Sequence, residues 1–191
     1  MSLSEAMQHL CNSLACVSYR GDQHSNILIK EVDTLATLKK VTLLAGNGDW
    51  FAFEPDKGRG KLAKMSELLA TGRAFDHHRA CDCVVLVFKD NKLHVLYIDL
   101  KSSNPIGYAG QFKSVRQFVR YLLGLLKEFH GADFSEMKES YLIFHGGKKP
   151  LLDKKTTVPL KAEKVGKTSP DKAFKQDVPN GAQLYLKAFL G

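Results

Sequence analysis

The sequence predicts a mixed α/β fold in which helices flank a central mixed sheet. Residues 81–103 form two apolar segments joined by Asp90 and Asn91, and short polar side chains tolerate the left-handed backbone of a two-residue hairpin turn. A long helical pattern at 108–129 and a short apolar segment at 141–144 follow. Both faces of the predicted hairpin are apolar, so other layers must cover it, and helices are the usual cover.

The chain before this central hairpin is predicted to add further elements. Apolar residues from Leu3 to Leu14 recur at the spacing of one helix face. Residues 27–38 fit either a strand or a helix. Strands at 40–45 and 49–53 flank Gly46-Asn47-Gly48, so they are expected to pair as a hairpin. The leucines and methionine at 62–69 predict a short helix that ends at Gly72.

The C-terminal part of the chain has a different composition. Residues 148–180 carry nine lysines and four acidic residues, which is typical of a long or disordered loop. Residues 182–190 regain a strand-like pattern and are expected to return to the sheet. We expect a single domain over residues 1–191, with a core at about 62–146. An N-terminal helix and hairpin (1–56) and a lysine-rich extension (147–191) flank that core.

The composition limits the class of protein and its partners. The chain has 191 residues, 44% of them hydrophobic, and a net charge of +8, which suggests nucleic acid, and DNA first, as the partner. The apolar segments are too short to span a membrane, and the N-terminus does not resemble a signal peptide. Four cysteines without a disulfide pattern predict reduced thiols in a cytoplasmic protein: Cys11, Cys16, Cys81 and Cys83.

Charged residues gather at one end of the predicted hairpin. A turn at 90–91 pairs Lys89 with Lys92 and therefore places Asp82 opposite Asp99. Lys101 has the same parity as Asp99 and points to the same face. Facing carboxylates repel each other, so a divalent cation is expected between them. Mg²⁺ or Mn²⁺ suits such oxygen ligands, with the backbone carbonyl of Leu100 as a further ligand, and Lys101 would assist an attacking water. The arrangement predicts hydrolysis of a phosphodiester.

This pattern resembles the PD-(D/E)xK nuclease superfamily. Asp82, a hairpin, Asp99-Leu100-Lys101 and a following helix match its signature over about residues 62–144. The resemblance implies a restriction endonuclease-like core in helix–strands–helix–strand order, with two metal-binding acids and an assisting lysine. Residues 79–82 are similar to the segment before the first acid of RecB-like nucleases, and Gln117 with Tyr121 matches their Gln-xxx-Tyr motif. Cys81 stands where the name of the superfamily expects proline.

Two glutamines compete for a place at the predicted site. Gln111 lies in the first turns of the long helix, near the face that packs on the sheet, so helix geometry favours it. Gln117, with Tyr121, is favoured by the motif of the nuclease family. Both alternatives stay open on the sequence. Three carboxylates upstream of the site are candidates for an additional acidic ligand: Glu31, Glu54 and Glu67.

Basic residues flank the predicted site and are candidates for contact with nucleic acid phosphates: Lys57, Arg59, Lys61, His77, Lys113 and Arg116. Metal ligation by His77 or His78, or a zinc site with Cys81 and Cys83, is a weaker alternative, since buried apolar cysteines are the commoner outcome. Two rivals to the enzyme remain: a non-catalytic nucleic-acid-binding module on the same fold, and a basic protein-interaction domain. A homodimer is also a possibility, because nucleases that cut both strands often dimerise.

Overall fold

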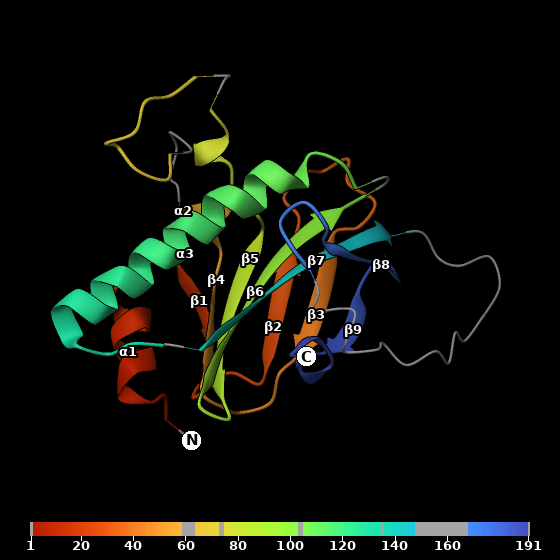
Figure 1. The fold of residues 1–191 in the computed structure, drawn as a ribbon. Coiled ribbons are helices and arrows are strands. Elements are labelled where there is room, and N and C mark those ends of the chain that lie inside the picture. The colour runs from red at the N-terminus through yellow and green to blue at the C-terminus, as the bar shows by residue number, and fades with distance from the viewer. Residues whose placement is uncertain are drawn as a thin grey trace.

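The computed structural model describes residues 2–58, 64–72, 75–102, 105–134, 136–147 and 168–190. They form a mixed α/β fold with two sheets, as Figure 1 shows. The larger sheet contains, in spatial order, β1 (Val17–Arg20), β4 (Trp50–Phe53), β5 (Cys83–Lys89), β6 (Lys92–Lys101), β7 (Met137–Gly147) and β8 (Phe174–Pro179). The smaller sheet contains β2 (Asn26–Lys30), β3 (Lys40–Leu44) and β9 (Ala182–Tyr185).

The helices are few, and one of them is long. They comprise α1 (Glu5–Asn12), α2 (Pro55–Gly58) and α3 (Tyr108–His130), with 3-10 turns η1 (Asp76–His78) and η2 (Leu186–Phe189). α3 runs obliquely across the larger sheet beside α1 (Figure 1). Among the residues that the structure describes, no helix combines the length and the hydropathy needed to cross a membrane.

The central hairpin has the predicted register. Lys89 pairs with Lys92, and the pairing continues to Cys83 opposite Ile98. Asp90 and Asn91 adopt φ angles of 51° and 58°, the left-handed conformation that a type I′ turn requires at both central positions. The register prediction is therefore confirmed over the whole length of β5.

The two faces of the larger sheet are covered by different layers. The even residues of β5, Val84 and Leu86, belong to a core shared with α1 and α3. Val85 and Val87 belong to a second core, which the smaller sheet closes with residues such as Ile29. The prediction of helices as the covering layer is thus correct for one face, while a second sheet covers the other.

Helix α3 forms the crossover between two parallel strands. β6 and β7 pair in parallel, from Leu93 opposite Met137 to Lys101 opposite His145. A crossover helix is the usual connection between parallel neighbours. The apolar stripe of α3 is buried as predicted: Phe112, Val115, Val119, Leu122 and Leu126. The helix ends one residue later than expected, at His130, where Gly131 adopts φ 64°.

The predicted hairpin at 40–53 is wrong. β3 pairs with β2 and β9, whereas β4 pairs with β1 and β5 in the other sheet. The segment around Gly46 crosses from one sheet to the other, and the Trp50 indole N–H donates a 2.9 Å hydrogen bond to the Gly46 carbonyl. All four residues of β4 are buried, so this strand needs partners on both edges and cover on both faces.

Four other local predictions are resolved by the structure. The ambiguous stretch at 27–38 forms β2 at its start. The expected helix at 62–69 is wrong for its described part, 64–69, since Leu68 is 94% exposed and no core supports an apolar helix face there. Within 148–180, where a loop was expected, β8 forms at the sheet edge; residues 148–167 lie outside the described part. Residues 182–190 form β9 and η2 and join the smaller sheet.

A candidate carboxylate and lysine site

The predicted charged residues meet at the end of β5 and β6, beside the first turns of α3. Asp99 lies on the β6 face that packs towards α3 and is 1% exposed. Lys101 follows on the same face, and its Nζ lies 2.7 Å from Asp99 Oδ2. This contact is an ion pair between the Lys101 ammonium and the Asp99 carboxylate. A buried carboxylate is thereby neutralised by a partly exposed ammonium.

Asp82 immediately precedes β5, whose first residue is Cys83, and its side chain reaches the site. Its Oδ2 accepts a 2.6 Å hydrogen bond from the backbone N–H of Leu100. The carboxylate takes the place that a backbone carbonyl would have if β5 began one or two residues earlier. It therefore lies in line with β5 rather than on a face of the sheet. Since both polar groups of a strand residue point to the same side, the Leu100 carbonyl also faces the end of β5.

The strand alternation stops at Asp82, and this corrects one expectation. Cys81 and Cys83 were expected on one face, opposite Asp82. Cys81 instead packs in the core beneath α3, while Cys83 packs in the core beneath the smaller sheet. All four cysteines are free thiols, and burial raises the pKa of Cys81 and Cys83 well above the usual value. They are apolar core residues, as predicted, and not thiolate ligands.

Gln111 is the glutamine that the fold brings to the site. Lys101 Nζ donates a 3.2 Å hydrogen bond to Gln111 Oε1, and Gln111 Nε2 donates a 2.9 Å bond to the Ala80 carbonyl. Lys101 therefore links Asp99 to α3, and the loop before Asp82 fixes the orientation of the amide. Gln117 and Tyr121 lie further along the helix and line a different cavity.

The carboxylates of the site resist ionisation in the absence of a cation. Burial raises the pKa of Asp82 well above its ordinary value, and the neighbouring charge of Asp99 raises it further. Burial also raises the pKa of Asp99, although the nearby Lys101 ammonium and a hydrogen bond with Asp82 lower it. Such a pair of carboxyl groups favours retention of a proton unless positive charge is supplied.

Glu31 is the additional acid closest to the site. It follows β2 in the sequence, and its charge raises the pKa of both Asp82 and Asp99. The other two candidates are occupied elsewhere. Glu54 accepts a hydrogen bond from Ser18 Oγ and pairs with Lys57 at 2.6 Å, while Glu67 pairs with Lys64 on the surface. Glu31 was one of three candidates on the sequence, with no reason to prefer it. Its position near the site depends on pairing between segments that are distant in the sequence, which local patterns do not reveal.

A small hollow opens above Lys101. Its volume is about 280 Å³, and its lining includes Arg79, Ala80, Gly107 and Gln111. Lys101 is 27% exposed to it, while Asp99 lies beneath. The hollow gives a solute access to the Lys101 ammonium, which pairs with the buried Asp99 carboxylate.

The predicted phosphate contacts are mostly engaged within the protein. Lys57 pairs with Glu54, and Lys113 pairs with Asp171 at 2.7 Å. Arg116 lies near the Tyr141 hydroxyl, where it opposes the rise in the Tyr141 pKa that burial causes. His77 Nε2 lies 2.8 Å from the Ala70 carbonyl. Arg59 and Lys61 lie outside the described residues.

The two histidines hold a loop rather than a metal. His78 Nδ1 accepts a 3.1 Å hydrogen bond from the Met65 N–H, and its Nε2 lies 3.1 Å from the Ala70 carbonyl. Across the described ranges, no group of three or more His, Cys, Asp or Glu side chains is placed to hold a metal by itself. The Asp82 and Asp99 pair is therefore the best candidate for a cation, with water and substrate oxygens as further ligands.

In comparisons with known proteins, no family model, curated protein or solved structure matches the chain.

Proposed function

We propose that the protein is a metal-dependent nuclease of the PD-(D/E)xK type, with a restriction endonuclease-like core, that hydrolyses DNA phosphodiester bonds. The observation that carries the proposal is the meeting of Asp82, Asp99, Lys101 and Gln111 at one end of the central hairpin. The order of the elements around the site supports it, because α1, the antiparallel strands, α3 and the parallel β7 follow one another as that core requires.

The donor set fits a hard divalent cation such as Mg²⁺ or Mn²⁺. The half-buried Asp82 carboxylate, the buried Asp99 carboxylate and the Leu100 carbonyl offer oxygen atoms only. Burial raises the pKa of both carboxyl groups, and a bound cation would favour their charged forms. When bound, the cation would neutralise charge on the phosphate and make a water molecule more acidic.

The chain's own residues would divide the remaining work. Lys101 lines the hollow and is the basic residue of the four, so it would orient the attacking water and stabilise negative charge that develops on the phosphate. Gln111 would hold the Lys101 ammonium in place, since its own amide is fixed by Ala80. Asp82 would keep the Leu100 backbone, and with it the end of β6, in register.

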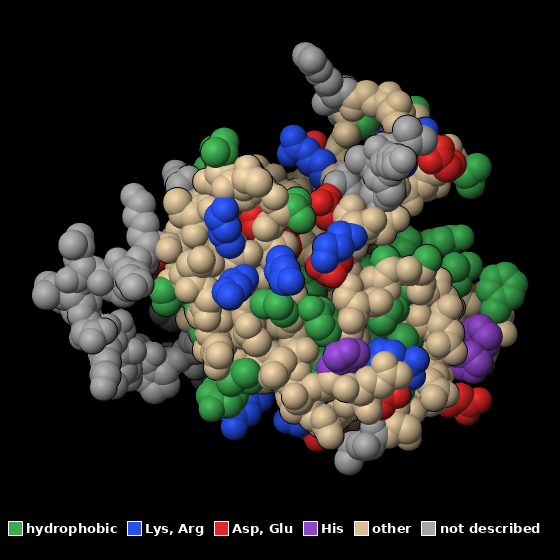
Figure 2. Space-filling view, turned by 180° about the vertical axis from the view of Figure 1, so that it is seen from behind, with side chains coloured by type: hydrophobic (Ala, Val, Ile, Leu, Met, Phe, Trp, Pro, Cys, Tyr) green, Lys and Arg blue, Asp and Glu red, His purple; other side chains and the backbone are tan. Residues whose placement is uncertain are grey.

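Charge supports an anionic substrate. The chain carries a net charge of +8. Figure 2 shows Lys and Arg side chains gathered near the middle of one face, with some acidic side chains between them. Mixed but predominantly positive surfaces of this kind bind nucleic acid through its phosphates.

A cleavage assay tests the proposal. Supercoiled plasmid and single-stranded DNA are incubated with the purified protein and Mg²⁺ or Mn²⁺, alongside Asp99→Ala and the exposed-turn control Asp90→Ala. We expect cleavage by the wild type and by Asp90→Ala, and none by Asp99→Ala or in EDTA. Binding with a steep salt dependence but no cleavage would identify a non-catalytic nucleic-acid-binding module. Absence of binding would leave a protein-interaction domain.

A further inference from the structure

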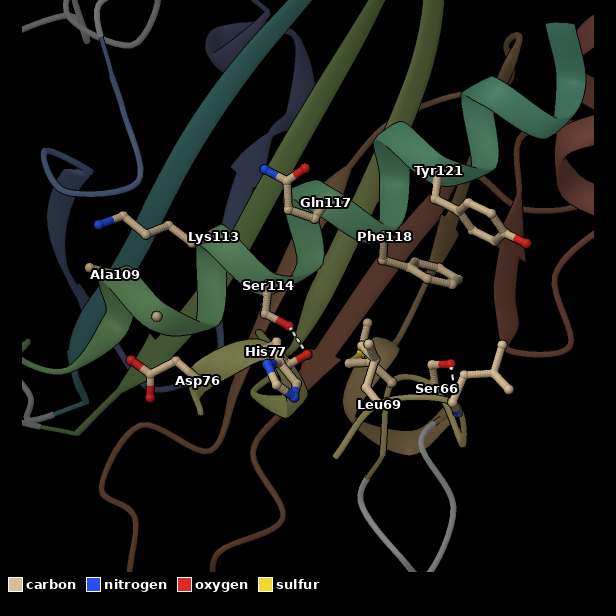
Figure 3. Close-up of a pocket in the computed structure, with 13 residues that line it drawn as sticks. Ser66, Leu69, Asp76, His77, Ala109, Lys113, Ser114, Gln117, Phe118 and Tyr121 are labelled. Carbon is tan, nitrogen blue, oxygen red and sulfur yellow. Dashed lines mark hydrogen bonds between the residues drawn. The ribbon is translucent and has the colours of Figure 1, made fainter. Parts of the chain in front are cut away.

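A larger cavity lies next to the carboxylate site, between α3 and the segment that precedes β5. We call residues 64–72 together with 75–78 the arm. The cavity has a volume of about 690 Å³, and both α3 and the arm line it. Figure 3 shows the arm beneath the helix, with Phe118 and Tyr121 projecting from the helix on the side of the arm. The cavity and the smaller hollow are neighbours, because Asp76 on the lining of the first pairs at 3.0 Å with Arg79 on the lining of the second.

The arm is held in a defined position, so the cavity has a fixed wall. Ser114 Oγ on α3 donates a 2.7 Å hydrogen bond to the His77 carbonyl (Figure 3). His78 in turn binds the Met65 N–H. Gly110 permits the close approach, since a Cβ there would lie 2.6 Å from Asp76 Oδ2. The gap between helix and arm is therefore built by specific contacts.

The lining combines apolar surface with a few polar groups. Met65, Leu69 and Phe118 supply apolar walls, and Tyr121 is 64% exposed at the opening. Polar groups on the lining include Lys113 and Gln117. An apolar slot with an aromatic ring, an amide and an ammonium suits a nucleobase, which stacks on its face and forms hydrogen bonds at its edge.

We propose that this cavity seats unpaired bases of a single-stranded DNA segment whose backbone continues into the Asp82 and Asp99 site. The inference rests on the proposed nuclease function and names its substrate form. Ten residues separate Gln111 from Tyr121, a rise of about 15 Å along α3, which a few nucleotides of an extended strand cover. Bases in a duplex are paired and stacked, so they cannot enter a recess between a helix and a loop.

Charge and position favour nucleic acid over an apolar peptide as the occupant. The net charge of +8 attracts a polyanion, and Lys113, which pairs with Asp171 at 2.7 Å, stands on the cavity wall with half of its side chain exposed. The cavity also lies along α3 beside a site suited to phosphate chemistry, and an apolar peptide has no phosphate to place there. A protein partner is therefore the outcome that the test must exclude.

Binding in the absence of metal tests the inference. Fluorescence anisotropy in EDTA compares a labelled oligothymidylate with an abasic strand of the same length, for the full chain, Tyr121→Ala and Phe129→Ala. Phe129 is the matched control, because it is an exposed aromatic on the same helix, 74% exposed and remote from the cavity lining. Neither ring is buried, so both variants are expected to fold.

We expect Tyr121→Ala to weaken oligothymidylate binding about tenfold or more, the usual loss for one stacking ring. Its affinity for the abasic strand and its salt dependence should match those of the wild type, because phosphate contacts remain. Phe129→Ala should change neither. Equal affinity of the wild type for both strands, or equal behaviour of the two variants, would overturn the inference and leave the cavity to an apolar partner.

The two proposals fail in different experiments. Base-dependent binding without Mg²⁺-dependent cleavage would refute the nuclease and retain the base-binding cavity. Cleavage without base-dependent binding would refute the base-binding cavity and retain the nuclease. The binding assay contains no metal, so a defect in the carboxylate site cannot imitate a defect in the cavity.

Discussion

The backbone N–H of Leu100 donates a hydrogen bond of 2.6 Å to Asp82 Oδ2. A side-chain carboxylate thus pairs with the backbone of β6 at a position that β5 does not reach. This contact brings Asp82 beside Asp99 where β5 begins and β6 ends. The backbone structure holds the two acids together, and a hydrogen bond between the carboxyl groups adds to it. Their proximity without a cation has a cost, because burial and mutual repulsion disfavour their charged forms.

Replacing Asp82 with Asn should stabilise the metal-free protein at alkaline pH. Folding raises the pKa of Asp82, so the stability that its protonated form contributes is present below the unfolded pKa of about 4 and is lost as pH rises through the higher folded pKa. Asp82→Asn avoids this loss and its amide oxygen can still accept the Leu100 bond. By calorimetry in EDTA, the Tm should exceed that of the wild type by about 2 °C or more well above that window. The two should converge below it, and Asp90→Asn, in the exposed turn, should show no such pH dependence.

Adding Mg²⁺ or Mn²⁺ should raise the Tm of the wild type. A ligand at about one hundred times its Kd stabilises the folded state by about 2.7 kcal/mol, and the cation also relieves the repulsion between Asp82 and Asp99. Thermal scans over a cation titration measure the effect, with EDTA to reverse it. The Tm of Asp82→Asn should respond far less. A similar response in both proteins would place the cation at another site.

Lys101→Met should abolish most cleavage while leaving the fold intact. Removing a positive group that stabilises developing charge typically lowers kcat by about 10²- to 10³-fold. Lys92→Met is the matched control, since Lys92 lies at the other end of the same strand and pairs with Glu136 on the surface. Rates of oligonucleotide cleavage at saturating substrate give the comparison. Unchanged kcat in Lys101→Met would remove the lysine from the mechanism.

The two glutamines should separate into different kinetic effects. Gln111 contacts Lys101 and Ala80, so Gln111→Ala should lower kcat, by about tenfold, as the ammonium loses its support. Gln117 lines the larger cavity, and Gln117→Ala should act on KM instead. Steady-state kinetics on single-stranded DNA distinguish the two. The opposite assignment would favour the family motif over the geometry found here.

Two glycines should respond to alanine in opposite directions. Gly147 has φ +83°, and a Cβ there would lie 2.4 Å from the backbone of Thr37 and Leu38, so Gly147→Ala should destabilise the protein by about 2 kcal/mol or more. Gly124 lies in α3 with nothing near its Cβ position, so Gly124→Ala should stabilise it by about 0.5–1 kcal/mol. Denaturant unfolding measures both. A neutral Gly147→Ala would show that the contact between β7 and the loop before β3 can give way.

Local chemistry made the central part of the fold predictable. A two-residue turn fixes the hairpin register, and a period near 3.6 fixes the buried stripe of α3, so both could be derived from neighbouring residues. The contact between Lys101 and Gln111 follows from those two elements. The candidate site was therefore predictable in part. The choice between Gln111 and Gln117 stayed open on the sequence, and the turn of the backbone at Asp82, which splits Cys81 from Cys83, was missed.

Long-range pairing made the rest unpredictable. The glycines on either side of Asn47 fit both a hairpin turn within one sheet and a connection that passes to another sheet. The burial of β4 on both faces distinguishes the two arrangements, and it is visible only in the structure. β8 lies at an edge and half of its residues are polar, so its sequence carries a weak apolar signal. The arm lacks a core to support a helix, and its position depends on His78 and Ser114, which the sequence does not reveal.

The smaller sheet depends on residues that are far apart in the chain. Asn180 Oδ1 accepts hydrogen bonds from the N–H groups of Lys39 and Lys40, across 141 and 140 positions of the chain, and β9 pairs with β3. Until the ribosome has released residues 180–185, one edge of β3 and part of the core behind it stay open. The nascent chain thus passes through a stage with an unpaired strand edge, the kind of edge that chaperones protect and that aggregation exploits.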